Sequence, residues 1–239
     1  MQLPLHNTSR APGHSLKPTT GRQHFPLLAL SWLCVLGGCA LLQPRADPTR
    51  FFVLNAPSPS DSRGAETQLK RWRVGLRRLE GPAYLRNKAI VVRIGRNELQ
   101  FADYDRWAEP LDQAISRVLK ETLSSSRNVE SVAFNSHGEA ALDYEVAIRV
   151  LACEGVRTET GGSSIHFAAT WELRSLEKHS TTTKRGLFTP DPVAWNGREY
   201  GQLAERLGEA VAGLSKTIAA SLPMETAPPD QPNSKNTRP

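Results

Sequence analysis

Few residues of this 239-residue chain have the types and spacing that catalysis or metal binding requires. His137-Gly138-Glu139 offers metal-ligand side chains in an expected turn, but fewer than a closed or catalytic zinc site needs. Asp103-Tyr104-Asp105 has the paired carboxylates of an acid–base site, yet aspartates just ahead of a helix also cap it and complement its dipole, and capping is favoured. The sequence also lacks the serine-hydrolase elbow, the phosphate loop and the dinucleotide fingerprint. We therefore expect no catalytic residue, no metal site and no enzyme.

The residues around Cys39 predict a processing site. A basic stretch without acidic side chains precedes residues 25–38, which are mostly apolar or small. This apolar stretch is too short to span a membrane stably as a helix, which is typical of a signal peptide. Gly37-Gly38 fits the narrow cleft of a peptidase that cuts just ahead of Cys39. We expect residues 1–38 to be a signal peptide; the less favoured alternative is a buried helix that ends at the two glycines.

The tetrad Leu36-Gly37-Gly38-Cys39 resembles the lipobox of bacterial lipoproteins. In that group the cysteine sulfur receives a diacylglyceryl group, and the new amino terminus is acylated, for example with palmitate. The resemblance implies that Cys39 carries a covalent lipid, that residues 39–49 are the lipidated tether, and that no other cofactor is needed. Because Ala40 rather than aspartate follows the cysteine, we expect delivery to the outer membrane, on its periplasmic face.

Cysteine usage agrees with this interpretation. Cys34 leaves with the signal peptide and Cys39 becomes the anchor, so Cys153 has no intramolecular partner and no disulfide framework is expected. Cys153 lies on a predicted strand beside apolar residues, where a cysteine is usually a small buried hydrophobe rather than a nucleophile.

The charge balance argues against nucleic acid as a partner. The whole chain has a formal net charge of +6, but residues 1–38 hold Arg10, Lys17 and Arg22 and no acidic residue. The remaining chain is only mildly basic, which is too little to draw a polyanion to its whole surface. Since no apolar run has the length of a membrane-spanning helix and the mean hydropathy is −0.41, a polytopic membrane protein is also excluded.

Hydrophobic periodicity predicts the fold. Apolar positions recur at helical spacing in residues 105–123 and 200–222, and Pro110 implies that the first ordered turn of the earlier helix begins close to it. Strands are predicted at residues 50–54, 74–76, 89–94 and 129–134, and a hairpin with a long loop at residues 144–153 and 165–174. We expect one α/β domain over residues 50–222, a mixed β-sheet with two long amphipathic helices packed on it. The Pro-rich residues 223–239 are expected to be disordered.

Three blocks, together with the lipobox, resemble a known family. They are Arg50-Phe51-Phe52-Val53-Leu54, Gly81-Pro82-Ala83-Tyr84-Leu85-Arg86-Asn87-Lys88 leading into Ile90-Val91-Val92-Arg93, and Asn97-Glu98-Leu99-Gln100-Phe101-Ala102-Asp103-Tyr104-Asp105-Arg106-Trp107-Ala108-Glu109-Pro110-Leu111. On these residues the chain resembles the ABC-type transport auxiliary lipoprotein family, the group of PqiC-like intermembrane transport lipoproteins. One departure is Phe51-Phe52, where the family often shows a tyrosine.

The resemblance implies an α/β lipoprotein that works as a docking or accessory component with an inner-membrane system. Its implied partners are an MCE-domain protein, ABC transporter components and membrane lipid through the acyl anchor. Such a system moves lipids between membranes, where a conduit is needed because each methylene exposed to water costs about 0.8 kcal/mol. The sequence leaves open whether the protein forms a homo-oligomer.

Arg106, Trp107 and Phe51 are the candidate partner-contact residues besides the lipidation site Cys39. Trp107 begins the apolar stripe of the expected helix, so packing in the core is favoured for it. Two other functions stay open. One is a structural lipoprotein that scaffolds a secretin or an export machine, and the other is an anchored hydrolase, for which no triad is recognisable.

Overall fold

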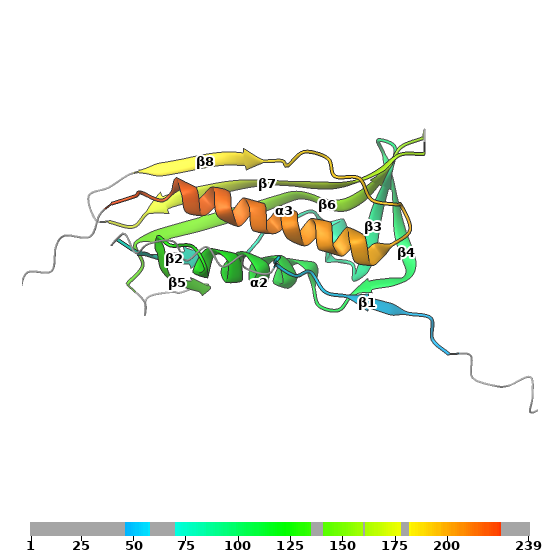
Figure 1. The fold of residues 1–239 in the computed structure, drawn as a ribbon, viewed down its shortest axis with the longest axis horizontal. Coiled ribbons are helices and arrows are strands. Elements are labelled where there is room, and N and C mark those ends of the chain that lie inside the picture. The colour runs from blue at the N-terminus through cyan, green and yellow to red at the C-terminus, as the bar shows by residue number, and fades with distance from the viewer. Residues whose placement is uncertain (1–45, 58–69, 135–140, 160, 178–181, 226–239) are drawn as a thin grey trace, which may run out of the picture. The chain divides into compact units, whose positions relative to one another are not determined.

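The computed structural model describes residues 46–57, 70–134, 141–159, 161–177 and 182–225 (Figure 1). Its elements are β1 (Arg50–Phe52), β2 (Trp72–Leu76), the short 3-10 helix η2 (Ala83–Arg86), β3 (Ala89–Ile94), β4 (Glu98–Trp107), α2 (Leu111–Ser124), β5 (Val129–Phe134), β6 (Tyr144–Arg157), β7 (Ser163–Ser175), β8 (Thr183–Phe188) and α3 (Tyr200–Ser221). The strands form one mixed sheet, and the two long helices lie on one face of it. The predicted fold class is therefore confirmed.

The sheet is built around β6. This strand pairs antiparallel with β7 from Tyr144, opposite Ser175, to Arg157, opposite Ser163, which confirms the predicted hairpin. Its other edge has two neighbours, because β2 runs parallel to its first residues and β3 runs parallel to its last. β5 extends the sheet beyond β2, while β4 and β1 extend it beyond β3. The sheet therefore divides along this edge of β6.

Apolar stripes hold the helices on the sheet, as their periodicity predicted. The buried large side chains of α3 are Leu203, Leu207, Val211, Leu214 and Ile218, and those of α2 are Leu111, Ile115, Val118, Leu119 and Leu123. Each such side chain stabilises the fold by about 1.5–3 kcal/mol when it leaves water.

The amphipathic stretch from residue 105 is helical only after Pro110, which confirms the start that this proline indicated, and the helical assignment is wrong for residues 105–107. β4 continues to Trp107, and α2 begins only after Pro110. Asp105 lies on β4, where its Oδ1 accepts a hydrogen bond from Arg50 Nε on β1 over 2.7 Å. Neither Asp103 nor Asp105 is a helix cap. Strand pairing on both sides of β4 outweighs the apolar periodicity that the segment shares with α2.

The segment after β1 is held against both long helices. A Cβ at Gly208 of α3 would overlap the carbonyl oxygen of Asn55, so only glycine allows this close approach. From α2, Arg117 Nη2 donates a hydrogen bond to Leu54 O over 2.7 Å. The two contacts fix the amino-terminal strand region on the helical layer.

Candidate functional site

A cleft opens where the edge of β6 passes from β2 to β3. The segment after β2 lies along this edge, since Glu80 N–H donates to Ile148 O over 3.2 Å and Val150 N–H donates to Glu80 O over 2.8 Å. Beside it is a cavity of about 820 Å³, here named the β2–α2 cleft, lined by residues 75–82, 85–86, 111–112, 115, 142, 145 and 150. It lies at the carboxyl end of β2 and the amino end of α2. Open α/β sheets commonly bind ligands at such strand ends.

Three arginines on the cleft have no carboxylate partner among the described residues. Arg77 and Arg78 directly follow β2, and Arg86 is the last residue of η2. All three are exposed. Within the described ranges, no ion pair or side-chain hydrogen bond engages their guanidinium groups. They are therefore available to an anionic ligand.

The acidic side chains of the cleft are mostly engaged. Glu80 Oε2 accepts from Arg149 Nη2 over 2.8 Å, and Glu145 Oε2 accepts from Arg174 Nη2 over 2.7 Å. Asp112 is the one carboxylate of the lining without an ion pair to another described residue. The charge available on the cleft is therefore positive.

The start of α2 adds to this positive potential. Its N-cap residue, Pro110, makes no side-chain capping hydrogen bond, and the N–H groups of Gln113 and Ala114 both donate to Pro110 O. The first N–H groups of the helix, at Leu111 and Asp112, thus lie at the cleft without a side-chain cap. Uncapped N–H groups and the helix dipole favour negative charge at this end.

A second cavity of about 850 Å³, here named the α2 hollow, lies along the exposed side of α2. It is lined by residues 77–79, 112–113, 116–117, 120–121, 124 and 134. Lys120 Nζ lies 5.5 Å from the centre of the Phe134 ring. Arg117 is already engaged, because its Nη2 donates to Glu109 Oε1 over 2.7 Å.

The residues predicted to contact a partner lie elsewhere, at the β1–β4 edge. Phe51 is 64% exposed and stands opposite Arg106 on the neighbouring strand, so the structure brings these two together. Trp107 stands opposite Phe52 and is only 3% exposed, in the core, which was the favoured interpretation for it. Cys39 lies outside the described residues.

A polar cluster around the buried Glu154 joins β3, β6 and β7. The Glu154 side chain is fully buried, its Oε1 accepts from Arg93 Nε over 2.5 Å, and His166 Nδ1 lies 3.9 Å from the same oxygen. Burial, together with the neighbouring Glu154 carboxylate, raises the pKa of Tyr84 to about 12. Glu154 Oε1 is thus paired, whereas its Oε2 is buried without a hydrogen-bond partner among the described residues. The cluster ties the three strands together.

Cys153 has the inert character that the sequence predicted. It is buried and unpaired in the described structure. Burial, and then the charge of Glu154, raises the pKa of its thiol to about 12. The thiol is therefore protonated at neutral pH and is a poor nucleophile.

Within the residues placed by the structure, no group of three or more His, Cys, Asp and Glu side chains could hold a metal ion. His137-Gly138-Glu139 falls outside them. In the same part of the chain, no helix is both long and apolar enough to cross a membrane.

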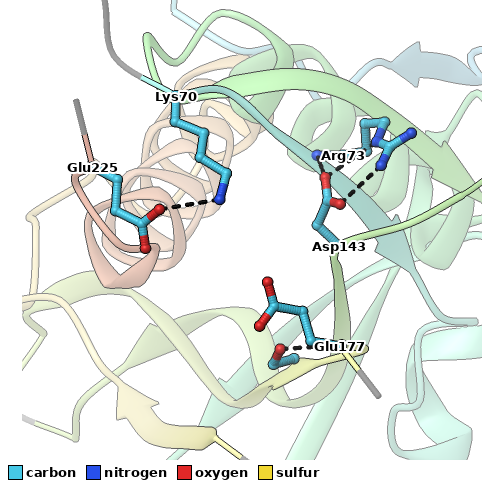
Figure 2. A network of polar contacts seen from close by, with 6 residues as sticks. Lys70, Arg73, Asp143, Glu177 and Glu225 are labelled. Atoms are coloured by element: carbon cyan, nitrogen blue, oxygen red, sulfur yellow. Dashed lines mark hydrogen bonds and ion pairs between the residues drawn. The ribbon is translucent and has the colours of Figure 1, made fainter. Parts of the chain in front are cut away.

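A second polar network attaches the segment after α3 to the start of β2 (Figure 2). Lys70 Nζ donates to Glu225 Oε2 over 3.1 Å, and Lys70 N–H donates to Glu225 O over 2.8 Å. Trp72 Nε1 donates to Pro223 O over 2.9 Å. These bonds close the end of the domain, and their role is structural.

The sequence of the folded domain identifies the family of the chain. A family model described as the ABC-type transport auxiliary lipoprotein component matches residues 52–219. The chain belongs to this family. The resemblance drawn from the three sequence blocks is thus confirmed at the level of the family. A search of curated proteins returned no match.

Solved structures share the fold of this transport auxiliary lipoprotein. The crystal structure of protein XCC0632 from Xanthomonas campestris, which carries the family model DUF330, is 15% identical with a TM-score of 0.59, over 72% of this chain and 93% of that one. The crystal structure of an uncharacterized protein is 18% identical with a TM-score of 0.52, over 72% of this chain and 97% of that one. At these identities the likeness concerns the fold alone.

The cleft arginines were not singled out from the sequence. Arg77-Arg78 directly after a predicted strand, with Gly81-Pro82 close behind, was the available signal, because charged residues at a strand's carboxyl end often face a ligand. Arg86 joins them only through the fold.

Proposed function

We propose that this family member is an outer-membrane-anchored periplasmic lipoprotein that serves as a docking component of an MCE/ABC-type intermembrane lipid transport system. The family match over residues 52–219 carries the proposal, since it covers nearly the whole folded body. The lipobox at Cys39 and the following Ala40 support the anchor and its membrane. The role is non-enzymatic, and the covalent lipid is the only group that it requires.

The anchor is tested by replacing the acceptor cysteine. Cys39→Ala removes the only sulfur at the expected cleavage site, so we expect an uncleaved or soluble precursor without acyl mass. Intact-mass spectrometry and membrane fractionation of protein from its native host measure both effects, with Cys153→Ala as the control that keeps the lipobox. Unchanged acylation and fractionation of Cys39→Ala would contradict the lipid anchor.

The partners are tested by crosslinking in intact cells. We expect MCE-domain and ABC transporter subunits to be recovered with the tagged wild-type lipoprotein after crosslinking and membrane solubilisation. Recovery of secretin or export-machine subunits without them favours the scaffold function instead.

A further inference from the structure

The β2–α2 cleft and the α2 hollow form one continuous surface. Both are lined by Arg77, Arg78, Leu79 and Asp112. The surface extends from Val150 on β6 to Ser124, the last residue of α2. Since α2 has 14 residues, its length is about 21 Å. A surface of this length fits several residues of a polypeptide better than a single small anion.

The charges available on this surface are mainly cationic. Arg77, Arg78 and Arg86 have no ion pair in the part of the chain that the structure places, and neither has Lys120. The glutamates of both linings are each engaged by an arginine, so Asp112 is the one carboxylate of the two linings without an ion pair to a described residue. A ligand that neutralises the surface therefore carries several negative charges.

The apolar part of the surface is small. Its apolar floor is covered by the chain itself: Leu76, Leu85, Leu111, Ile115 and Val150 are each no more than 8% exposed. Leu79 and Leu142 are half-buried, and Phe134 is 40% exposed. These positions suit one or two apolar side chains of a peptide and offer little area to an acyl chain.

We propose that this surface docks an acidic segment of a partner protein. Carboxylates of the segment pair with Arg77, Arg78 and Arg86, and an apolar side chain packs on Leu79 or Phe134. Arginine suits this role because its guanidinium binds a carboxylate through two parallel hydrogen bonds. The inference rests on the proposed docking function, since it requires a protein partner, and it assigns the surface used.

The test uses the full-length lipoprotein in non-ionic detergent and a labelled peptide of glutamate and serine with one central leucine. We expect R77E/R78E to weaken binding of this peptide by about tenfold or more, because close charge pairs at interfaces are strongly coupled. The control R96E/R198E makes the same charge change at exposed arginines outside both linings, and we expect it to stay within about twofold of wild type. A matching lysine peptide should bind R77E/R78E better than wild type.

Thermal unfolding followed by circular dichroism checks that each variant folds. R77Q/R78Q removes the two charges without reversing them. If R77E/R78E unfolds, peptide binding is compared between wild type and R77Q/R78Q instead. Equal peptide binding by wild type and R77Q/R78Q overturns the proposal.

Two further binding measurements distinguish an acidic peptide from phosphate-containing ligands. Inorganic phosphate and phosphatidylglycerol vesicles are offered to the same variants. If these bind through Arg77 and Arg78 while the acidic peptide does not, the surface recognises phosphate groups and the proposal is overturned.

Crosslinking in cells separates this inference from the proposed function. We expect wild type and R96E/R198E to recover MCE-domain or ABC transporter subunits, and R77E/R78E to lose them. Undiminished recovery with R77E/R78E overturns the docking surface alone. A wild-type protein that recovers none of these subunits overturns the proposed function, while the peptide measurements still decide whether the surface binds acidic segments.

Discussion

At the scale of single residues, the buried carboxylate of Glu154 ties β6 to β3 through Arg93. Glu154 is fully buried, and Arg93 is its close cationic partner. Removing one member of a buried pair leaves an uncompensated charge, which costs about 3–5 kcal/mol. We therefore expect Arg93→Met to lower the free energy of unfolding by about 3 kcal/mol, measured by urea denaturation.

Two comparisons make this prediction specific. The double variant R93M/E154Q removes both charges and should recover most of the lost stability. Arg149→Met breaks the exposed pair with Glu80, whose side chains are more than half exposed, and should cost about 1 kcal/mol or less. Equal losses for Arg93→Met and Arg149→Met would show that burial does not govern the effect.

A single glycine sets the approach of the amino-terminal segment to α3. Gly208→Ala places a Cβ against the carbonyl of Asn55, so we expect a loss of about 1–3 kcal/mol and a lower Tm. Gly201→Ala is the matched control on the same helix, because its Cβ would meet only the Phe52 ring at an ordinary 3.7 Å. Alanine there should be neutral or stabilise by up to about 1 kcal/mol, as it favours the helix.

At the scale of elements, the sequence predicted those whose burial imposes a period. The β6–β7 hairpin alternates, and α2 and α3 carry apolar stripes, so each was recognised. β8 was missed because its residues are exposed or half-buried, and its sequence, three polar residues followed by Gly186-Leu187-Phe188, does not alternate between polar and apolar residues. The first part of the predicted helix is β4, whose pairing with β1 and β3 depends on segments distant in the chain. Non-local pairing of this kind leaves little local signal.

The junction between β2 and β6 has a pH dependence with a definite sign. Arg73 Nη2 pairs with Asp143 Oδ1 over 2.9 Å, and this hydrogen bond lowers the pKa of Asp143 below its ordinary 3.8 (Figure 2). A depressed folded-state pKa contributes stability above the unfolded pKa, which is lost as the pH falls through the folded pKa. Between about pH 6 and about pH 3, the free energy of unfolding should therefore fall more steeply in wild type than in Asp143→Asn.

Urea denaturation across this pH range measures the difference. Asp191→Asn is the control, because it removes an exposed carboxylate outside the helices that has no ion pair with any described residue. Parallel pH profiles for wild type and Asp143→Asn would contradict the contribution of the Arg73–Asp143 pair.

At the scale of the whole molecule, the net charge of the chain did not indicate the positive charge of the β2–α2 cleft. The formal charge of +6 falls to a mild excess once residues 1–38 are set aside, which argued against a polyanion partner. At the β2–α2 cleft, however, the carboxylates of Glu80 and Glu145 pair with arginines that lie outside the lining. The arginines of the lining are therefore left without an ion pair among the described residues. Arg86 lies beside Arg77 and Arg78 because the sheet divides along β6. The positions of these arginines in the sequence do not predict that they share one cleft.

The proposed outer-membrane location predicts that the residue after the expected lipidation site directs sorting, independently of the folded body. Aspartate directly after a lipidated cysteine usually retains a lipoprotein in the inner membrane, so we expect Ala40→Asp to move the protein from the outer-membrane to the inner-membrane fraction. Its acylation and the Tm of its domain should not change, because position 40 precedes the folded body, whose first element begins at Arg50. Density-gradient separation of the two membranes measures the shift, and we expect the control Ala40→Ser to keep the wild-type distribution. An Ala40→Asp protein that keeps its full acyl mass and its wild-type distribution would mean that this position does not direct sorting, and the outer-membrane assignment would lose its support.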